Sequence, residues 1–156
     1  LKPFLLKSSS LRHCARTLDS RSLLFAMAAV KELNEEAEKY KGRGNDFFKA
    51  GDWEKAVKEY NKAITLDPGN AVYYSNRSGA WSSKGSHQSA LRDAEKCIEL
   101  DPQFAKGYAR KAKALFDTFQ TNDAEAAYKE GLKVDPTNAA CLTGLADVQA
   151  SRGPPK

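Results

Sequence analysis

Five polar side chains have the types and the spacing needed to bind an acidic group. They are Lys41, Asn45, Asn76, Lys106 and Arg110. Lys41 and Asn45 are four residues apart, as are Lys106 and Arg110, so each pair would lie side by side on the surface of a helix. Two cations at that spacing repel each other unless an anion lies between them.

The set holds three cations and two amides, and it contains no carboxylate. The acidic residues gather in other segments, at Glu54, Glu59, Asp93, Glu95 and Glu99. Any one of the lysines alone would be an ordinary exposed side chain. Together, the five predict a pocket for the carboxylates of a peptide, in which Lys and Arg supply charge and Asn supplies hydrogen bonds of both kinds.

Residues suited to catalysis or to metal binding are sparse. His13 and His87 are the only histidines, and neither is a credible general base for a Ser or Cys nucleophile. Cys14, Cys97 and Cys141 lack Cys-x-x-Cys spacing, so we interpret them as unpaired thiols. No strand is predicted that a Gly-rich phosphate loop could follow. We therefore expect no enzyme activity, no metal site and no cofactor.

The elements that must position these side chains repeat every 34 residues. Successive Asp-Pro pairs end at Pro68, Pro102 and Pro136. The same shift superposes small and aromatic positions, namely Ala56, Ala90 and Ala124, and Tyr40, Tyr74 and Tyr108. A period of this length is typical of stacked helical repeats. We predict an all-α fold in which each repeat is a helix, a short turn and a second helix.

Turn residues predict where the helices end. Gly51 would end the first helix of the first repeat and Asp52 would cap the second, and Gly85 and Ser86 would do the same in the next repeat. The third repeat has Phe119 in a turn where a Gly is expected, so this turn should be less ideal. The second helix of each repeat should stop before its Asp-Pro pair, because proline disfavours helical geometry in the preceding residue.

Residues 1 to 26 differ in composition from the rest of the chain. They carry five Lys or Arg residues against Asp19 alone, and so account for most of the net charge of +5. A positive charge on a tail, rather than on a folded face, argues against nucleic-acid binding. The segment fits a disordered extension of added sequence, or of sequence upstream of a natural start at Met27. It also has the composition of an organellar transit peptide, and both interpretations stay open.

A capping helix over residues 139 to 152 should follow the repeats, with Thr137 and Asn138 as its N-terminal cap. Its apolar face would consist of Ala139, Leu142, Leu145, Ala146 and Val148. Such a helix covers the surface that the last repeat would otherwise expose. Residues 153 to 156 would begin a flexible linker. The sequence has no run of 18 or more apolar residues, so we expect no membrane span.

This pattern resembles the tetratricopeptide repeat (TPR) family. Gly44, Tyr60 and Ala63 occupy slots that the family pattern reserves for small and aromatic residues. The resemblance covers three repeats, at about 37–70, 71–104 and 105–138. It implies a TPR superhelix over residues 27 to 152, capping helix included.

Three segments are similar to the carboxylate clamp of co-chaperone TPR domains. They are Lys41-Gly-Arg-Gly-Asn45, Tyr74-Ser-Asn76 and Lys106-Gly-Tyr-Ala-Arg110. The resemblance implies that these five residues grip the C-terminal Glu-Glu-Val-Asp tail of heat-shock protein 70 or heat-shock protein 90. Over about residues 33 to 150, the chain is most similar to the first TPR domain of the Hsp-organising, or stress-inducible, co-chaperone family, which prefers heat-shock protein 70.

The resemblance implies a cytoplasmic adaptor of the stress response that binds chaperones without catalysis. Two alternatives stay open. One is the clamp domain of another co-chaperone, such as a ubiquitin ligase, a phosphatase or a prolyl isomerase. The other is an organellar import receptor or imported TPR protein, for which residues 1 to 26 would be a real targeting segment.

Overall fold

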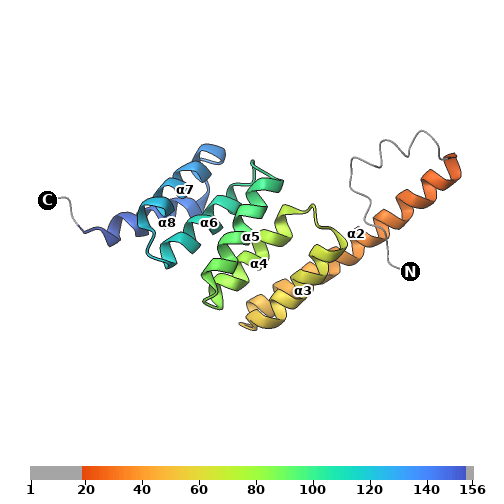
Figure 1. Ribbon diagram of the computed structural model, residues 1–156, viewed down its shortest axis with the longest axis horizontal. Helices are drawn as coiled ribbons and strands as arrows, with labels where there is room; N and C mark the ends of the chain where they lie inside the picture. The colour runs from red at the N-terminus through yellow and green to blue at the C-terminus, as the bar shows by residue number, and fades with distance from the viewer. Residues whose placement is uncertain (1–18, 154–156) are drawn as a thin grey trace. The chain divides into compact units, whose positions relative to one another are not determined.

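The computed structural model describes residues 19–153 (Figure 1). Its helices are α2 (Ser20–Lys49), α3 (Trp53–Leu66), α4 (Ala71–Ser83), α5 (His87–Leu100), α6 (Ala105–Asp117), α7 (Thr121–Val134) and α8 (Ala139–Ser151). These residues contain no strand, so the predicted all-α fold is confirmed. The chain divides into two units between Glu35 and Glu36. We call the described part of the second, residues 36–153, the repeat unit.

The described part of the first unit is helical. Helix α2 begins at Ser20, and the carboxylate of Asp19 accepts a hydrogen bond from the backbone N–H of Ser22 at 2.8 Å. This contact satisfies one of the free N–H groups of the first turn. Residues 20 to 26, which belong to the expected N-terminal extension, are therefore part of helix α2. The rest of that expected extension, residues 1 to 18, lies outside the described residues, as do residues 154 to 156 of the expected linker.

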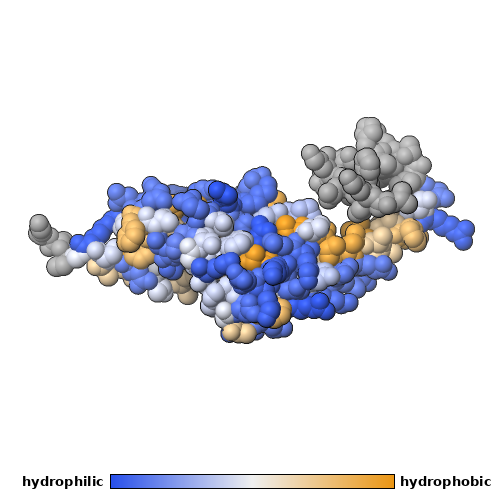
Figure 2. Space-filling view, turned by 60° about the horizontal axis from the view of Figure 1, so that its bottom comes forward, coloured by the Kyte–Doolittle hydropathy of each residue, from blue (hydrophilic) through white to orange (hydrophobic). Residues whose placement is uncertain are grey.

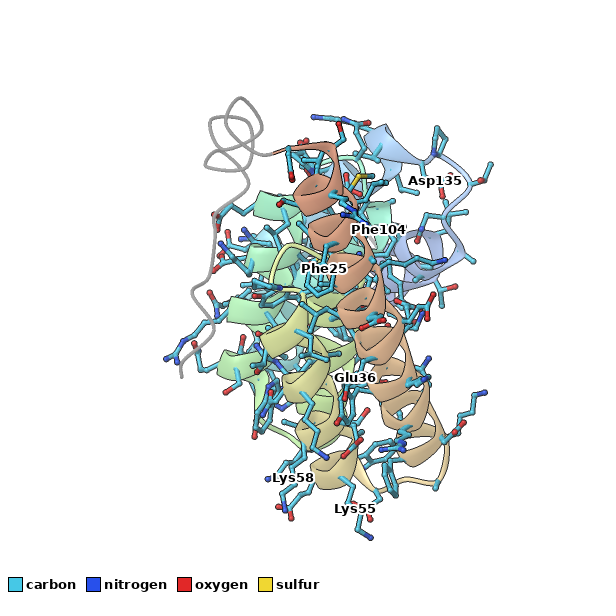
Figure 3. The ribbon with its side chains drawn as sticks, turned by 90° about the vertical axis from the view of Figure 1, so that its right-hand side faces the viewer. Phe25, Glu36, Lys55, Lys58, Phe104 and Asp135 are labelled. Carbon is cyan, nitrogen blue, oxygen red and sulfur yellow. The ribbon has the colours of Figure 1, made fainter. Side chains whose placement is uncertain are left out.

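Paired helices build the repeat unit. Helix α4 packs on α5 and α6 packs on α7, while α5 packs on α6 and joins the two pairs. Figure 3 shows α3 beside the C-terminal part of α2, with the exposed Lys55 and Lys58 near the beginning of α3. Small residues allow the close approach of these two helices. A Cβ atom at Gly44 would lie 2.5 Å from Cε1 of Tyr60, so only Gly leaves room for that ring.

The first two turns contain the residues that the sequence predicts for them. Gly51 and Gly85 have φ values of 80° and 84°, in the left-handed region that favours glycine. The carboxylate of Asp52 accepts from the backbone N–H of Lys55 at 3.1 Å, so the predicted cap is confirmed. Ser86 is also the residue before its helix, but its side chain makes no capping hydrogen bond. The predicted side-chain cap at Ser86 is therefore wrong.

The third turn departs from this pattern, as expected. Phe119 is in the position equivalent to Gly51 and Gly85, and it adopts a φ of 62°. Its side chain is 93% exposed and so gains almost nothing from packing. A side chain in the left-handed region costs roughly 1–2 kcal/mol. The turn therefore holds local strain that no burial offsets.

Replacing Phe119 by Gly should stabilise the repeat unit by about 0.5–1 kcal/mol. The relief of the left-handed backbone exceeds the extra chain entropy that Gly adds to the unfolded state, which is roughly 0.4–1 kcal/mol. Urea denaturation followed by circular dichroism measures the difference. Gly85→Ala is the matched control and should destabilise the protein. A Cβ atom at position 85 would meet no neighbouring atom, so the positive φ of Gly85 is the source of the expected cost. A lower free energy of unfolding for Phe119→Gly would contradict the assignment of strain to this turn.

The second helix of each pair ends where the sequence predicts. Helices α3, α5 and α7 end at Leu66, Leu100 and Val134, immediately before the Asp-Pro pairs. The Asp residues that follow have ψ values of 87°, 92° and 97°, which are outside the helical region. This geometry is the one that a following proline imposes.

Helix α8 is present, and its buried face agrees only in part with the expected one, because Val148 is buried and Leu145 packs against the core. The side chain of Asn138 caps it by accepting from the backbone N–H of Cys141 at 3.1 Å. The buried positions of α8 are Cys141, Gly144 and Val148. Leu142 is 49% exposed instead. The ring of Tyr128 decides this orientation, because a Cβ atom at position 144 would lie 2.1 Å from its Cζ atom.

In the view of Figure 2, polar residues cover most of the surface of the repeat unit. No helix within residues 19–153 combines the length and the apolar character that a membrane span needs.

Candidate carboxylate-binding site

The five predicted site residues come from the first helix of each pair. Lys41 and Asn45 lie on α2, Asn76 lies on α4, and Lys106 and Arg110 lie on α6. Four of them line one cavity of about 160 Å³, together with Phe48, Lys49 and Tyr60. Lys41 is not part of this lining. Residues up to 65 positions apart in the sequence, from Asn45 to Arg110, are thus brought together around a single hollow.

A hydrogen-bond network fixes the two amides. The hydroxyl of Tyr60 donates to Oδ1 of Asn45 at 2.8 Å, and Nδ2 of Asn76 donates to the same oxygen at 3.3 Å. Because the carbonyl of Asn45 accepts both bonds, its NH₂ group is the part that it can offer to a ligand. The network therefore presents N–H donors to the cavity and suits an acceptor such as a carboxylate.

The two cations on α6 are partly withdrawn from water. Burial lowers the pKa of Lys106, and the nearby charge of Arg110 lowers it further. Burial also lowers the pKa of Arg110. Neither side chain forms an ion pair with a carboxylate of residues 19–153, and the buried Nε of Arg110 has no hydrogen-bond partner among them. A desolvated charge without a partner is unfavourable, so an anion that enters the site lowers the free energy of the protein.

Glycine makes the space that Arg110 occupies. A Cβ atom at Gly79 of α4 would lie 2.8 Å from Cζ of Arg110. The guanidinium group therefore packs directly against the backbone of the neighbouring helix. This contact holds the charge at the wall of the cavity rather than in open solvent.

Three further residues line the cavity but were not predicted from the sequence to belong to the site, namely Phe48, Lys49 and Tyr60. Burial raises the pKa of Tyr60 to about 12, against the opposing effect of the Arg110 charge, so its hydroxyl stays a donor at neutral pH. Tyr60 was assigned only to an aromatic slot of the repeat. Lys49 carried a usable signal, because it lies four residues after Asn45 and hence on the same side of the helix.

Lys41 is placed differently from the other four. Its Nζ atom forms an ion pair with Oε2 of Glu38, one turn earlier on α2. The other oxygen of Glu38 accepts a hydrogen bond from the hydroxyl of Tyr73 at 2.8 Å. Lys41 is thus in contact with a carboxylate of the chain itself, and it is not among the residues that line the cavity.

A second hollow adjoins the first along α6. It has a volume of about 500 Å³ and lies between α6 and α8. Lys106 and Arg110 line both hollows, and Lys113, Thr143 and Asp147 line only the second. The two cations therefore form a wall that both spaces share.

Two family models match the chain. The model described as TPR repeat matches residues 44–78, and the one described as tetratricopeptide repeat matches residues 105–138. The Hsp70-Hsp90 organising protein of Plasmodium falciparum is 44% identical over 115 residues, which cover 74% of this chain and 46% of that protein. The chain thus spans less than half the length of this relative.

Solved structures with the same fold contain bound peptides. The second TPR domain of human RPAP3, in complex with the HSP70 peptide SGPTIEEVD, matches with a TM-score of 0.70 and 30% identity, over 75% of this chain and 98% of that one. The first TPR of Spaghetti (RPAP3), bound to the HSP90 peptide SRMEEVD, matches with a TM-score of 0.71 and 26% identity, over 78% of this chain and 96% of that one.

Proposed function

This chain belongs to the tetratricopeptide repeat family, and from that premise we propose that its repeat unit binds the acidic C-terminal tail of a heat-shock protein 70 or heat-shock protein 90 chaperone. The observation that carries the proposal is the pair Lys106 and Arg110, two partly buried cations without a carboxylate partner within residues 19–153. A peptide that ends in Asp brings two carboxylates on one residue. These negative charges would therefore supply the partners that Lys106 and Arg110 lack.

We assign the two carboxylates of that residue to different walls of the cavity. Asn45 and Asn76 present N–H donors from α2 and α4, and with Lys41 they receive the terminal carboxylate. Lys106 and Arg110 on α6 receive the Asp side chain. Hydrogen bonds to charged groups contribute about 1.5–3 kcal/mol each, more than neutral ones. Recognition is thereby concentrated on the last residue of the tail.

The module acts by binding and needs no catalytic group. Within a longer co-chaperone of the cytoplasm, it would hold one chaperone while other parts of the protein hold a second. The domain that does so extends over residues 27 to 152 in this proposal. Whether the tail of heat-shock protein 70 or of heat-shock protein 90 binds more tightly depends on contacts upstream of the last residue.

Fluorescence anisotropy with two labelled peptides tests the proposal. One peptide ends in Ile-Glu-Glu-Val-Asp and the other in Met-Glu-Glu-Val-Asp, and both should bind saturably and more weakly as salt rises, because the contacts are ionic. The control peptide has the same composition, with its Asp moved from the end to the interior. Equal binding of the control would contradict a site that reads the C-terminal residue. The ratio of the two dissociation constants gives the chaperone preference.

A further inference from the structure

Among residues 19–153, Glu38 is the acidic side chain that forms an ion pair with a proposed clamp residue. It lies one turn before Lys41 on α2, and its Oε2 atom pairs with Nζ of that lysine. Its Oε1 atom accepts from the hydroxyl of Tyr73, which lies on α4 and is 1% exposed. The carboxylate is therefore held between Lys41 of α2 and Tyr73 of α4.

The electrostatics of this contact keep Glu38 charged. The hydrogen bond from Lys41, followed by that from Tyr73, lowers the pKa of Glu38. Burial, followed by the hydrogen bond to Glu38, raises the pKa of Tyr73, so the phenol remains a donor. At neutral pH, Lys41 thus faces a full negative charge that belongs to the chain itself.

Lys41 differs in this respect from the other two clamp cations. Lys106 and Arg110 have no carboxylate partner within residues 19–153, whereas Lys41 has one. The side chain of Lys41 is 26% exposed and that of Glu38 is 50% exposed, so the pair is open to exchange with solvent and ligands. Lys41 can leave Glu38 for another carboxylate, but Glu38 stays anchored by Tyr73.

We propose that Glu38 competes with the peptide for Lys41 and so limits the affinity of the module for acidic tails. This inference rests on the proposed function. To bind the terminal carboxylate, Lys41 gives up or shares its contact with Glu38. The remaining charge of Glu38 also repels an acidic peptide. Both effects weaken peptide binding, since the first stabilises the free module and the second destabilises the complex.

Glu38→Gln tests the competition with little change to the fold. Glutamine keeps an oxygen that can accept from Tyr73 and removes the charge that holds Lys41. We expect the Met-Glu-Glu-Val-Asp peptide to bind about two- to fivefold more tightly, as is typical of the loss of one partly exposed ion pair. In a Lys41→Met background, the gain from Glu38→Gln should shrink, because no lysine remains to be released. Binding is measured by anisotropy at low salt, and folding by the thermal midpoint.

Glu99→Gln is the matched control. Glu99 forms the same type of ion pair, with Lys96 three residues earlier on α5, at 2.8 Å. The substitution Glu99→Gln removes the same charge at a position that does not line the cavity, and it should leave the peptide affinity within a factor of about 1.5. Unchanged or weaker binding of Glu38→Gln, or an equal gain from Glu99→Gln, would overturn the competition while leaving the proposed function in place. If the wild-type chain binds no acidic tail, the proposed function and this inference both fail.

Discussion

Amidation of the C-terminus should weaken binding of a Glu-Glu-Val-Asp peptide by at least about 100-fold. The change replaces a charged carboxylate by a neutral carboxamide, while the Asp side chain stays intact. Lys41, Asn45 and Asn76 then lose an oxyanion, and the new NH₂ group faces their own donors. Two lost charge-assisted hydrogen bonds at about 1.5–3 kcal/mol each account for this factor, since about 1.4 kcal/mol corresponds to tenfold in affinity.

A competition assay measures this effect directly. The amidated peptide and its free-acid form are each used to displace a labelled free-acid peptide from the wild-type chain. A free-acid peptide with one internal Glu changed to Gln is the control for lost charge, and it should lose far less affinity. If the amidated peptide competes as well as the free acid, the clamp assignment fails, and the cavity must recognise residues further upstream.

Replacing Arg110 by Met should weaken tail binding by about 10- to 100-fold without lowering the stability of the fold. The guanidinium group supplies charge-assisted hydrogen bonds to the Asp side chain, and methionine supplies none. Yet Arg110 is partly buried, its Nε has no partner among the described residues, and burial lowers its pKa. Removing a desolvated charge relieves an unfavourable interaction of the free protein. Binding and stability should therefore respond in different directions.

Lys111→Met is the control for this substitution. Lys111 is the next residue on α6, but its side chain pairs with Glu95 of α5 at 3.3 Å. Its loss should leave peptide affinity within about twofold. Anisotropy gives the dissociation constants and urea denaturation gives the free energies of unfolding. A fall of more than about 1 kcal/mol in the free energy of unfolding of Arg110→Met would show that Arg110 stabilises the packing of the helices and is not a ligand-binding residue alone.

The sequence by itself determined the features that depend on local geometry. The 34-residue period and the Asp-Pro pairs predicted where α3, α5 and α7 end, because proline constrains the residue before it wherever it occurs. Gly51 and Gly85 predicted where the first helices of two repeats end, and Phe119 predicted a less ideal third turn. The structure gives all three residues a positive φ. The types and spacing of the five site residues likewise predicted an anion site on the first helix of each pair. Four of these five residues line one cavity.

Only the tertiary structure decided which side chains meet across helices. The bond from Tyr60 to Asn45 spans 15 residues, and that from Tyr73 to Glu38 spans 35, so neither follows from the periodicity of one helix. The orientation of α8 depends on the ring of Tyr128, which fits only against a glycine. The apolar pattern of α8 correctly included Val148, but it missed Cys141 and Gly144 and included the exposed Leu142. Spacing along a chain fixes which residues share a helix face. The pairing of one face with another depends on side-chain volumes and hydrogen-bond partners that become neighbours only when the helices pack.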